Sequence, residues 1–200
     1  MEFNIVAAIL AILGVLLLWL TKPTLNPKVV SKKVEKLNLE DLKKTLDNSE
    51  RETANLIQGT EAHIQFATPE VPQTTDLVFM YVHGFSATWK ETDPVASTLA
   101  KRFGANLLQC RIAGHGTGPE GMKATAEEWI ASLNYQAEIA AQLGRNIIII
   151  GVSTGAPLAI WLSTQAIIKN QITALLFMSP NFKIKPAIGA LLTWPITSHL

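Results

Sequence analysis

Short apolar runs recur through the middle of the chain, and helix-like patterns separate them. The run Ile147–Ile150 contains no polar residue, as is typical of a buried strand. Alternation of strands with helices predicts an α/β fold with a mostly parallel sheet flanked by helices. Strands are expected at 61–67, 77–82, 106–111, 146–150 and 173–178.

Turn and cap residues predict where the helices between these strands begin and end. The first is expected to start with Asp93 as its cap and Pro94 at its first position. In the second, Thr125 and Glu128 have the spacing of a capping box. Trp161 is expected on the core side of the third. Together these signals predict helices at 93–104, 125–144 and 154–170.

The N-terminal segment has a different pattern, because residues 3–20 are almost entirely apolar. A helix of this length is about 27 Å long, which barely spans a bilayer core. Trp19 suits the membrane interface, and Thr21-Lys22-Pro23 ends the apolar run. A secretory signal peptide is the alternative, but the chain begins Met1-Glu2 and lacks a small-residue cleavage pattern. We therefore predict an uncleaved transmembrane anchor over residues 1–21, with membrane lipids as its partner.

Several lysines follow the apolar run, whereas only the terminal amine is positive before it. The positive-inside rule then predicts a single-pass protein with its globular part in the cytoplasm, to be tested by salt extraction of the membrane fraction. Residues 22–59 are predicted to be a polar spacer with one short helix around Leu39, Leu42 and Leu46. Its lysines are interspersed with acidic residues, which favours a solvated face over contact with lipid head groups. Residues 60–182 would then form the α/β core.

Composition excludes several kinds of partner. The chain has 17 basic and 16 acidic residues, so charge gives no reason to expect a nucleic acid. Cys110 is the one cysteine, which excludes an intrachain disulfide, and it is expected to be a small buried strand residue. The four histidines are scattered without metal-ligand spacing. The sequence implies neither a metal nor a cofactor.

The motif Gly151-Val152-Ser153-Thr154-Gly155 carries the strongest chemical signal. A strand is expected to lead into it and a helix to leave it, and that context holds a serine hydroxyl on a tight strand-to-helix turn. Gly151 and Gly155 lack a Cβ where strand and helix crowd together, which lets the turn close. Ser153 is therefore the candidate nucleophile.

Two further motifs occur before this one, and in order. His83-Gly84-Phe85 follows the second predicted strand, and Arg111-Ile112-Ala113-Gly114-His115-Gly116 follows the third. With the serine motif they make the chain resemble the α/β-hydrolase superfamily, and within it the monoacylglycerol-lipase and lysophospholipase-like serine hydrolases. The resemblance covers residue 61 to the end.

The resemblance implies a role for each motif. Ser153 would form an acyl-enzyme with a small acyl-ester substrate, and the backbone N–H groups of Phe85 and Thr154 would form the oxyanion hole. His83 and His115 would shape and buttress loops rather than act as the base. The remaining loop-shaping positions are Gly84, Gly114, Gly116, Gly151 and Gly155.

One part of the expected chemistry is missing from the sequence. The hydrolase order is serine, then acid, then histidine, yet no Asp or Glu follows Ser153 and the one later imidazole is His199. The chain is expected to be the first part of a longer protein, with an incomplete sheet and residues 183–200 beginning a lid-like insertion. A truncated or degenerate relative is the alternative.

The predicted function is a membrane-anchored serine hydrolase that cleaves carboxylic esters. The same nucleophile and oxyanion hole also serve thioesterases, acyltransferases and amidases, which the sequence does not separate from esterases. The alternative from a different class is a noncatalytic domain that binds lipid or a partner protein.

Overall fold

The computed structural model describes residues 2–20, 33–166 and 168–183. The chain divides into two units, one of residues 1–26 with 183–200 and one of residues 27–182. In the first unit, helix α1 spans Glu2–Leu20. The apolar side chains of α1 whose exposure is described are exposed, among them Ile5 (57%) and Leu20 (73%). No helix in the described part of the chain is long and apolar enough to cross a membrane. The predicted helix is confirmed, whereas the prediction that it spans a membrane is not supported.

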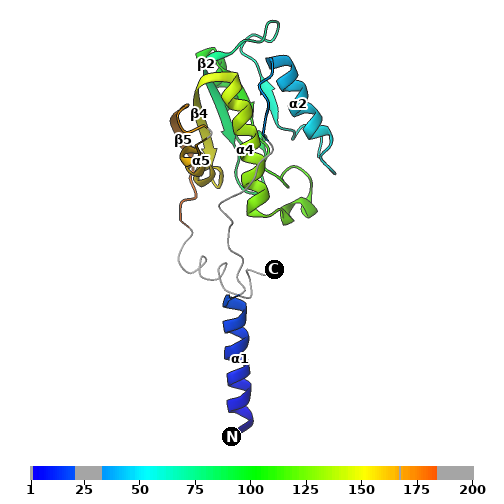
Figure 1. The fold of residues 1–200 in the computed structure, drawn as a ribbon, viewed down its shortest axis with the longest axis vertical. Helices are drawn as coiled ribbons and strands as arrows, with labels where there is room; N and C mark the ends of the chain where they lie inside the picture. The colour runs from blue at the N-terminus through cyan, green and yellow to red at the C-terminus, as the bar shows by residue number, and fades with distance from the viewer. Residues whose placement is uncertain (1, 21–32, 167, 184–200) are drawn as a thin grey trace. The chain divides into compact units, whose positions relative to one another are not determined.

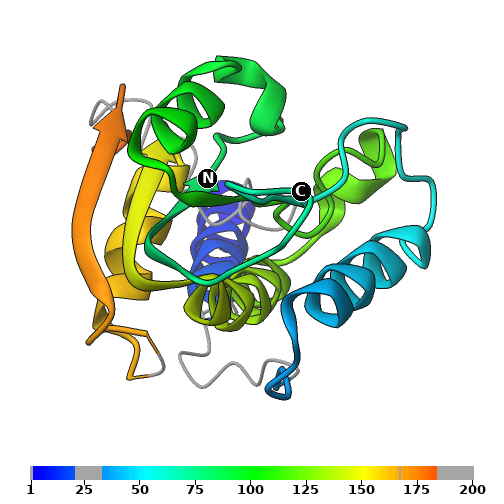
Figure 2. The ribbon, with the colours of Figure 1, turned by 90° about the horizontal axis from the view of Figure 1, so that it is seen from above.

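The second unit is built on a five-stranded sheet in the order β1-β3-β2-β4-β5 (Figures 1 and 2). Strand β1 pairs antiparallel with β3, and the other neighbours are parallel, which confirms the predicted mostly parallel sheet. The strands are β1 (His63–Gln65), β2 (Thr75–Val82), β3 (Asn106–Gln109), β4 (Gly144–Val152) and β5 (Ile172–Met178).

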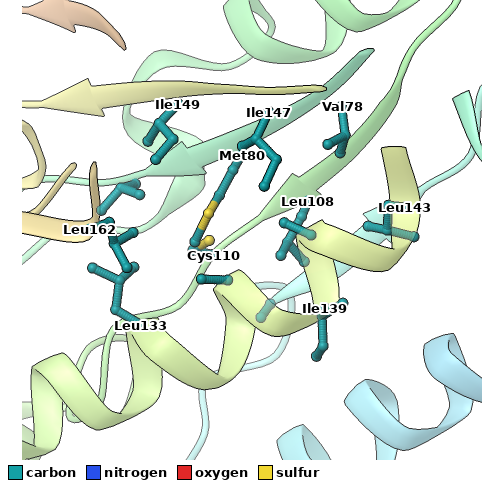
Figure 3. Packing of buried hydrophobic residues seen from close by; sticks show 14 of the residues in the cluster. Val78, Met80, Leu108, Cys110, Leu133, Ile139, Leu143, Ile147, Ile149 and Leu162 are labelled. Carbon is teal, nitrogen blue, oxygen red and sulfur yellow. The ribbon is translucent and has the colours of Figure 1, made fainter. Parts of the chain in front are cut away.

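Helices cover both faces of this sheet, and the alternation of side chains along the strands explains why. Met80 of β2 and Ile149 of β4 belong to the core shared with helices α2 (Leu39–Arg51), α4 (Ala126–Leu143) and α5 (Gly155–Thr164) (Figure 3). Tyr81 and Ile150, one residue further on, pack with helix α3 (Val95–Phe103) on the other face. A strand buried on both faces needs a continuous apolar run, as β4 has.

The predicted helices are present, with two corrections at their ends. Helix α3 begins at Val95 with Pro94 in the cap position, so Asp93 is not its cap. Helix α5 ends at Thr164, short of the predicted residue 170, because Gln165 turns to an extended conformation with ψ 130°. The capping box of α4 forms as predicted, with the Glu128 amide donating to Thr125 Oγ1 at 3.2 Å. Trp161 packs partly buried against the core.

Helix α2 corrects the interpretation of residues 22–59 as a polar spacer. Leu42 and Leu46 of α2 are fully buried in the core beneath the sheet, and Glu50 is 6% exposed. The helix is therefore amphipathic and part of the α/β domain, although its exposed face carries charged residues. The predicted lid-like segment, apart from Lys183, lies outside the described residues.

Candidate active site

Ser153 lies on the turn between β4, which ends at Val152, and α5, which begins at Gly155. Its φ is +48°, an uncommon conformation for a non-glycine residue. The Ser153 amide donates to the carbonyl of Met178 at 3.0 Å, and the Ser153 carbonyl accepts the amide of Asn181 at 3.1 Å. The end of β5 thus holds the turn from the side, and the strand, turn and helix are confirmed.

Both glycines of the motif lie where a side chain has no room. A Cβ on Gly155 would lie 2.2 Å from the carbonyl oxygen of Val82, and one on Gly151 would lie 2.8 Å from the Cα of Ala156. These are backbone contacts, which no rotamer change relieves. The predicted reason for glycine at positions 151 and 155 is therefore confirmed by the packing.

The loop after β2 passes directly against Ser153, since a Cβ on Gly84 would lie 3.2 Å from the Cβ of Ser153. The carbonyl of Gly84 accepts from His83 Nδ1 at 2.8 Å. In a trans peptide the N–H points opposite to the carbonyl, so the Phe85 amide points away from His83. Over the described ranges, neither the Phe85 amide nor the Thr154 amide has a hydrogen-bond partner. These two donors are free to receive a ligand oxygen.

His83 is buried, and both of its ring nitrogens are engaged. Nδ1 donates to the carbonyl of Gly84, and Nε2 accepts the amide of Ile112 at 3.0 Å. Burial lowers the pKa of His83 to about 4, which keeps the ring neutral at physiological pH. Without a free nitrogen this histidine cannot take a proton from Ser153, and its contacts join the loop after β2 to the loop after β3.

The neutral state of His83 predicts that the domain loses stability in mild acid. The pKa of the His83 imidazole is 6.5 in the unfolded chain, whereas it is about 4 in the folded chain. The contribution of neutral His83 to the free energy of unfolding is therefore complete above pH 6.5. It is lost as the pH falls from 6.5 to about 4, and the total loss is about 3 kcal/mol. Burial also lowers the pKa of His63 and His115, which adds in the same direction. Urea unfolding at several pH values measures this slope, and a His83→Asn variant should flatten it. Equal slopes in the two proteins would contradict the assignment.

The Gly-His-Gly loop lies beside the loop after β2. His115 is 1% exposed and its ring lies 4.9 Å from that of His83 and 5.1 Å from that of Trp129, between ring centroids. A Cβ on Gly114, whose φ is +77°, would lie 2.0 Å from the carbonyl oxygen of Gly121, so only glycine fits. The carbonyl of Gly116 accepts the amide of Ile57 at 2.8 Å. These positions support a loop-shaping role.

No sequence motif pointed to three polar residues of this region, which are Glu50, Tyr81 and Glu91. Glu91 accepts the amide of Gly84, and Tyr81 donates to the same carboxylate at 3.1 Å. Glu50 of α2 forms a bidentate ion pair with Arg111, and Arg111 also donates to the carbonyl of His115 at 3.4 Å. Their partners lie far away in sequence or across a loop, so no motif spacing reveals them.

The remaining candidate groups give no second site. Cys110 is fully buried, as predicted, and burial raises the pKa of its thiol, which disfavours the nucleophilic thiolate. Among the residues that the structure describes, no three His, Cys, Asp or Glu side chains gather to hold a metal ion. Ser153 therefore stays the candidate nucleophile of this region.

Proteins similar to this chain include one curated protein and two solved structures. No family model matches the chain. A thermostable monoacylglycerol lipase from Bacillus sp. (strain H-257) is 31% identical over 98 residues, which are 48% of this chain and 39% of that protein. A structure described with the metagenome-derived lipolytic enzymes LipS and LipT has a TM-score of 0.57 at 21% identity, covering 68% of this chain and 52% of that one. Est1E from Butyrivibrio proteoclasticus, bound to ferulic acid, has a TM-score of 0.53 at 20% identity, covering 70% and 56%.

The chain thus has an α/β-hydrolase-like fold of the lipase and esterase kind. It spans 39% of the curated relative and little more than half of these two structures.

Proposed function

We propose that this chain carries the nucleophile and the oxyanion hole of a serine hydrolase that cleaves carboxylic esters. The observation that carries the proposal is the position of Ser153, with φ +48° between β4 and α5. It lies against a loop whose Phe85 amide has no hydrogen-bond partner among the described residues. Two of the similar proteins named above, a monoacylglycerol lipase and a lipolytic enzyme, support ester chemistry.

In this proposal, Ser153 Oγ attacks the ester carbonyl carbon while a base removes the hydroxyl proton. The negative charge that develops on the carbonyl oxygen is stabilised by the amides of Phe85 and Thr154, each worth on the order of 3 kcal/mol in the transition state. The base returns this proton to the leaving oxygen, and the alcohol departs. Water then attacks the acyl-enzyme with help from the same base, which releases the carboxylic acid and restores the Ser153 hydroxyl. Because both nitrogens of His83 are occupied, the proposal does not use His83 as the base, and it assigns neither the base nor its carboxylate partner to a particular residue.

The surroundings of the oxyanion loop favour an apolar acyl group. Phe85 is 59% exposed, and its ring lies 5.9 Å from that of Trp129 and 6.1 Å from that of His115. An exposed aromatic surface beside the nucleophile suits an apolar chain better than a charged one. Thioester and amide substrates would contact the same serine hydroxyl and the same two backbone N–H groups. The preference for esters therefore depends on how the protein binds the acyl group and the leaving group.

A fluorophosphonate probe tests the proposal on the full-length protein. We expect one labelled peptide, which contains Ser153, and loss of labelling after heat denaturation. A noncatalytic domain that binds lipid through the same surface is the competing function. Folded, full-length protein that binds an ester analogue but leaves the probe unreacted would favour that function and reject the hydrolase.

A further inference from the structure

The carboxylate of Glu91 lies at the loop that carries the Phe85 amide. Glu91 belongs to the short 3₁₀ helix Trp89–Thr92, and its own amide donates to the carbonyl of Thr88 at 3.1 Å. Its Oε1 accepts the Gly84 amide at 2.6 Å. One turn of helix therefore places an anionic acceptor directly on the backbone of the loop after β2.

A second contact holds the same oxygen in place. Tyr81 of β2 donates its hydroxyl to Glu91 Oε1 at 3.1 Å, and accepts from Thr92 Oγ1 at 2.7 Å. Burial raises the pKa of Tyr81, so the hydroxyl keeps its proton and remains a donor. A sheet residue thus fixes the carboxylate, and the carboxylate in turn fixes the Gly84 amide.

Two consecutive peptide groups of the loop are fixed in this way. Glu91 holds the N–H of Gly84, and His83 Nδ1 holds the carbonyl of Gly84. With both ends of Gly84 bonded, its amide is excluded as an oxyanion donor, and the Phe85 amide is the next one along the chain. A hydrogen bond to a carboxylate is stronger than one to a neutral acceptor, so the bond from Gly84 to Glu91 holds this peptide group strongly.

Glu91 also lies close to the nucleophile without bonding to it. The point where a Gly84 Cβ would lie is 3.2 Å from Glu91 Oε2 and also 3.2 Å from the Cβ of Ser153. In the described ranges no hydrogen bond joins Glu91 to Ser153. The carboxylate therefore contacts the loop and not the serine hydroxyl.

We propose that Glu91 is a positioning residue, which binds the Gly84 amide so that the Phe85 amide is aimed at the ester oxygen. This inference rests on the proposed serine hydrolase function. It predicts that the acceptor at position 91 matters for the transition state and little for substrate binding, because an oxyanion donor acts only once charge has developed.

The test compares Glu91→Ala with Glu91→Gln in the full-length protein, using a soluble short-chain p-nitrophenyl ester. We expect Glu91→Ala to lower kcat about 10- to 100-fold with KM within about twofold, since a misplaced donor costs part of an oxyanion contact. Glu91→Gln keeps an amide oxygen as acceptor and should restore most of the lost kcat. Glu120→Ala is the matched control, because Glu120 is exposed and pairs only with Lys123 within the described chain.

Hydrogen exchange provides a readout that does not depend on activity. The Gly84 amide, which Glu91 accepts in the wild type, should exchange at least about tenfold faster in Glu91→Ala than in Glu120→Ala, while peptides from β4 stay unchanged. Unchanged kcat and unchanged exchange in Glu91→Ala would overturn the inference. A wild-type protein that the fluorophosphonate leaves unlabelled would reject the hydrolase proposal, and the exchange result would still decide whether Glu91 orders the loop.

Discussion

Ser153→Ala is expected to lower ester hydrolysis by the full-length protein about 10⁴-fold or more, with little change in substrate affinity. The reason is that the acyl-enzyme cannot form without the hydroxyl, whereas the Phe85 and Thr154 amides remain and leave a small residual rate. The side chain is not required for the turn, since the backbone of Ser153 makes the bonds to Met178 and Asn181. Purified enzyme assayed with a p-nitrophenyl ester, at matched protein concentration, measures the loss.

A serine on the helix that follows the nucleophile is a suitable control for this variant. Ser163 of α5 donates to the carbonyl of Ile160 at 2.6 Å within its own helix, so Ser163→Ala should leave the rate within about twofold. Equal unfolding midpoints for the three proteins would show that the loss is chemical rather than structural. If Ser153→Ala retains wild-type hydrolysis, the nucleophile is another residue and the proposed mechanism is wrong.

The elements that support Ser153 could be predicted because their signals are local. A continuous apolar run, a glycine-bracketed serine and a capping box each act over a few residues, and β4, the turn and α4 follow them closely. Strands β2, β3 and β4 are parallel, so the loops that carry the other two motifs lie at the same sheet edge as Ser153. Local patterns of this kind are the most dependable part of a sequence.

Apart from the ends of α3 and α5, the features that the sequence did not reveal depend on contacts between separate segments of the chain. Helix α2 has a mostly charged sequence, and its place in the core depends on Leu42 and Leu46 meeting a sheet that begins later in the chain. The bond of Glu91 to Gly84 depends on the path of a 3₁₀ turn, which no residue spacing encodes. The pairing of Glu50 with Arg111 spans 61 positions, and only the folded topology brings the two together.

Glu50→Ala is expected to destabilise the domain by about 3–5 kcal/mol. Glu50 and Arg111 are each about 8% exposed at their side chains, and removal of the carboxylate leaves a buried guanidinium without its counter-charge. The Ala62 amide loses its acceptor as well, at 3.0 Å in the wild type. Arg111 also donates to the carbonyl of His115, so the loop beside Phe85 should loosen and hydrolysis should fall together with stability. Urea unfolding at pH 7.5 measures the change in the free energy of unfolding.

Two further variants separate the buried charge from the size of the side chain. Glu52→Ala, on an exposed residue just past the end of α2, should change the free energy of unfolding by less than about 0.5 kcal/mol. The double variant Glu50→Met with Arg111→Met removes both charges and should recover much of the lost stability, because an apolar pair of similar volume needs no counter-charge. If the double variant is instead less stable than Glu50→Ala, then the cost lies in lost packing and hydrogen bonds, and the ion pair is not what ties α2 to the Gly-His-Gly loop.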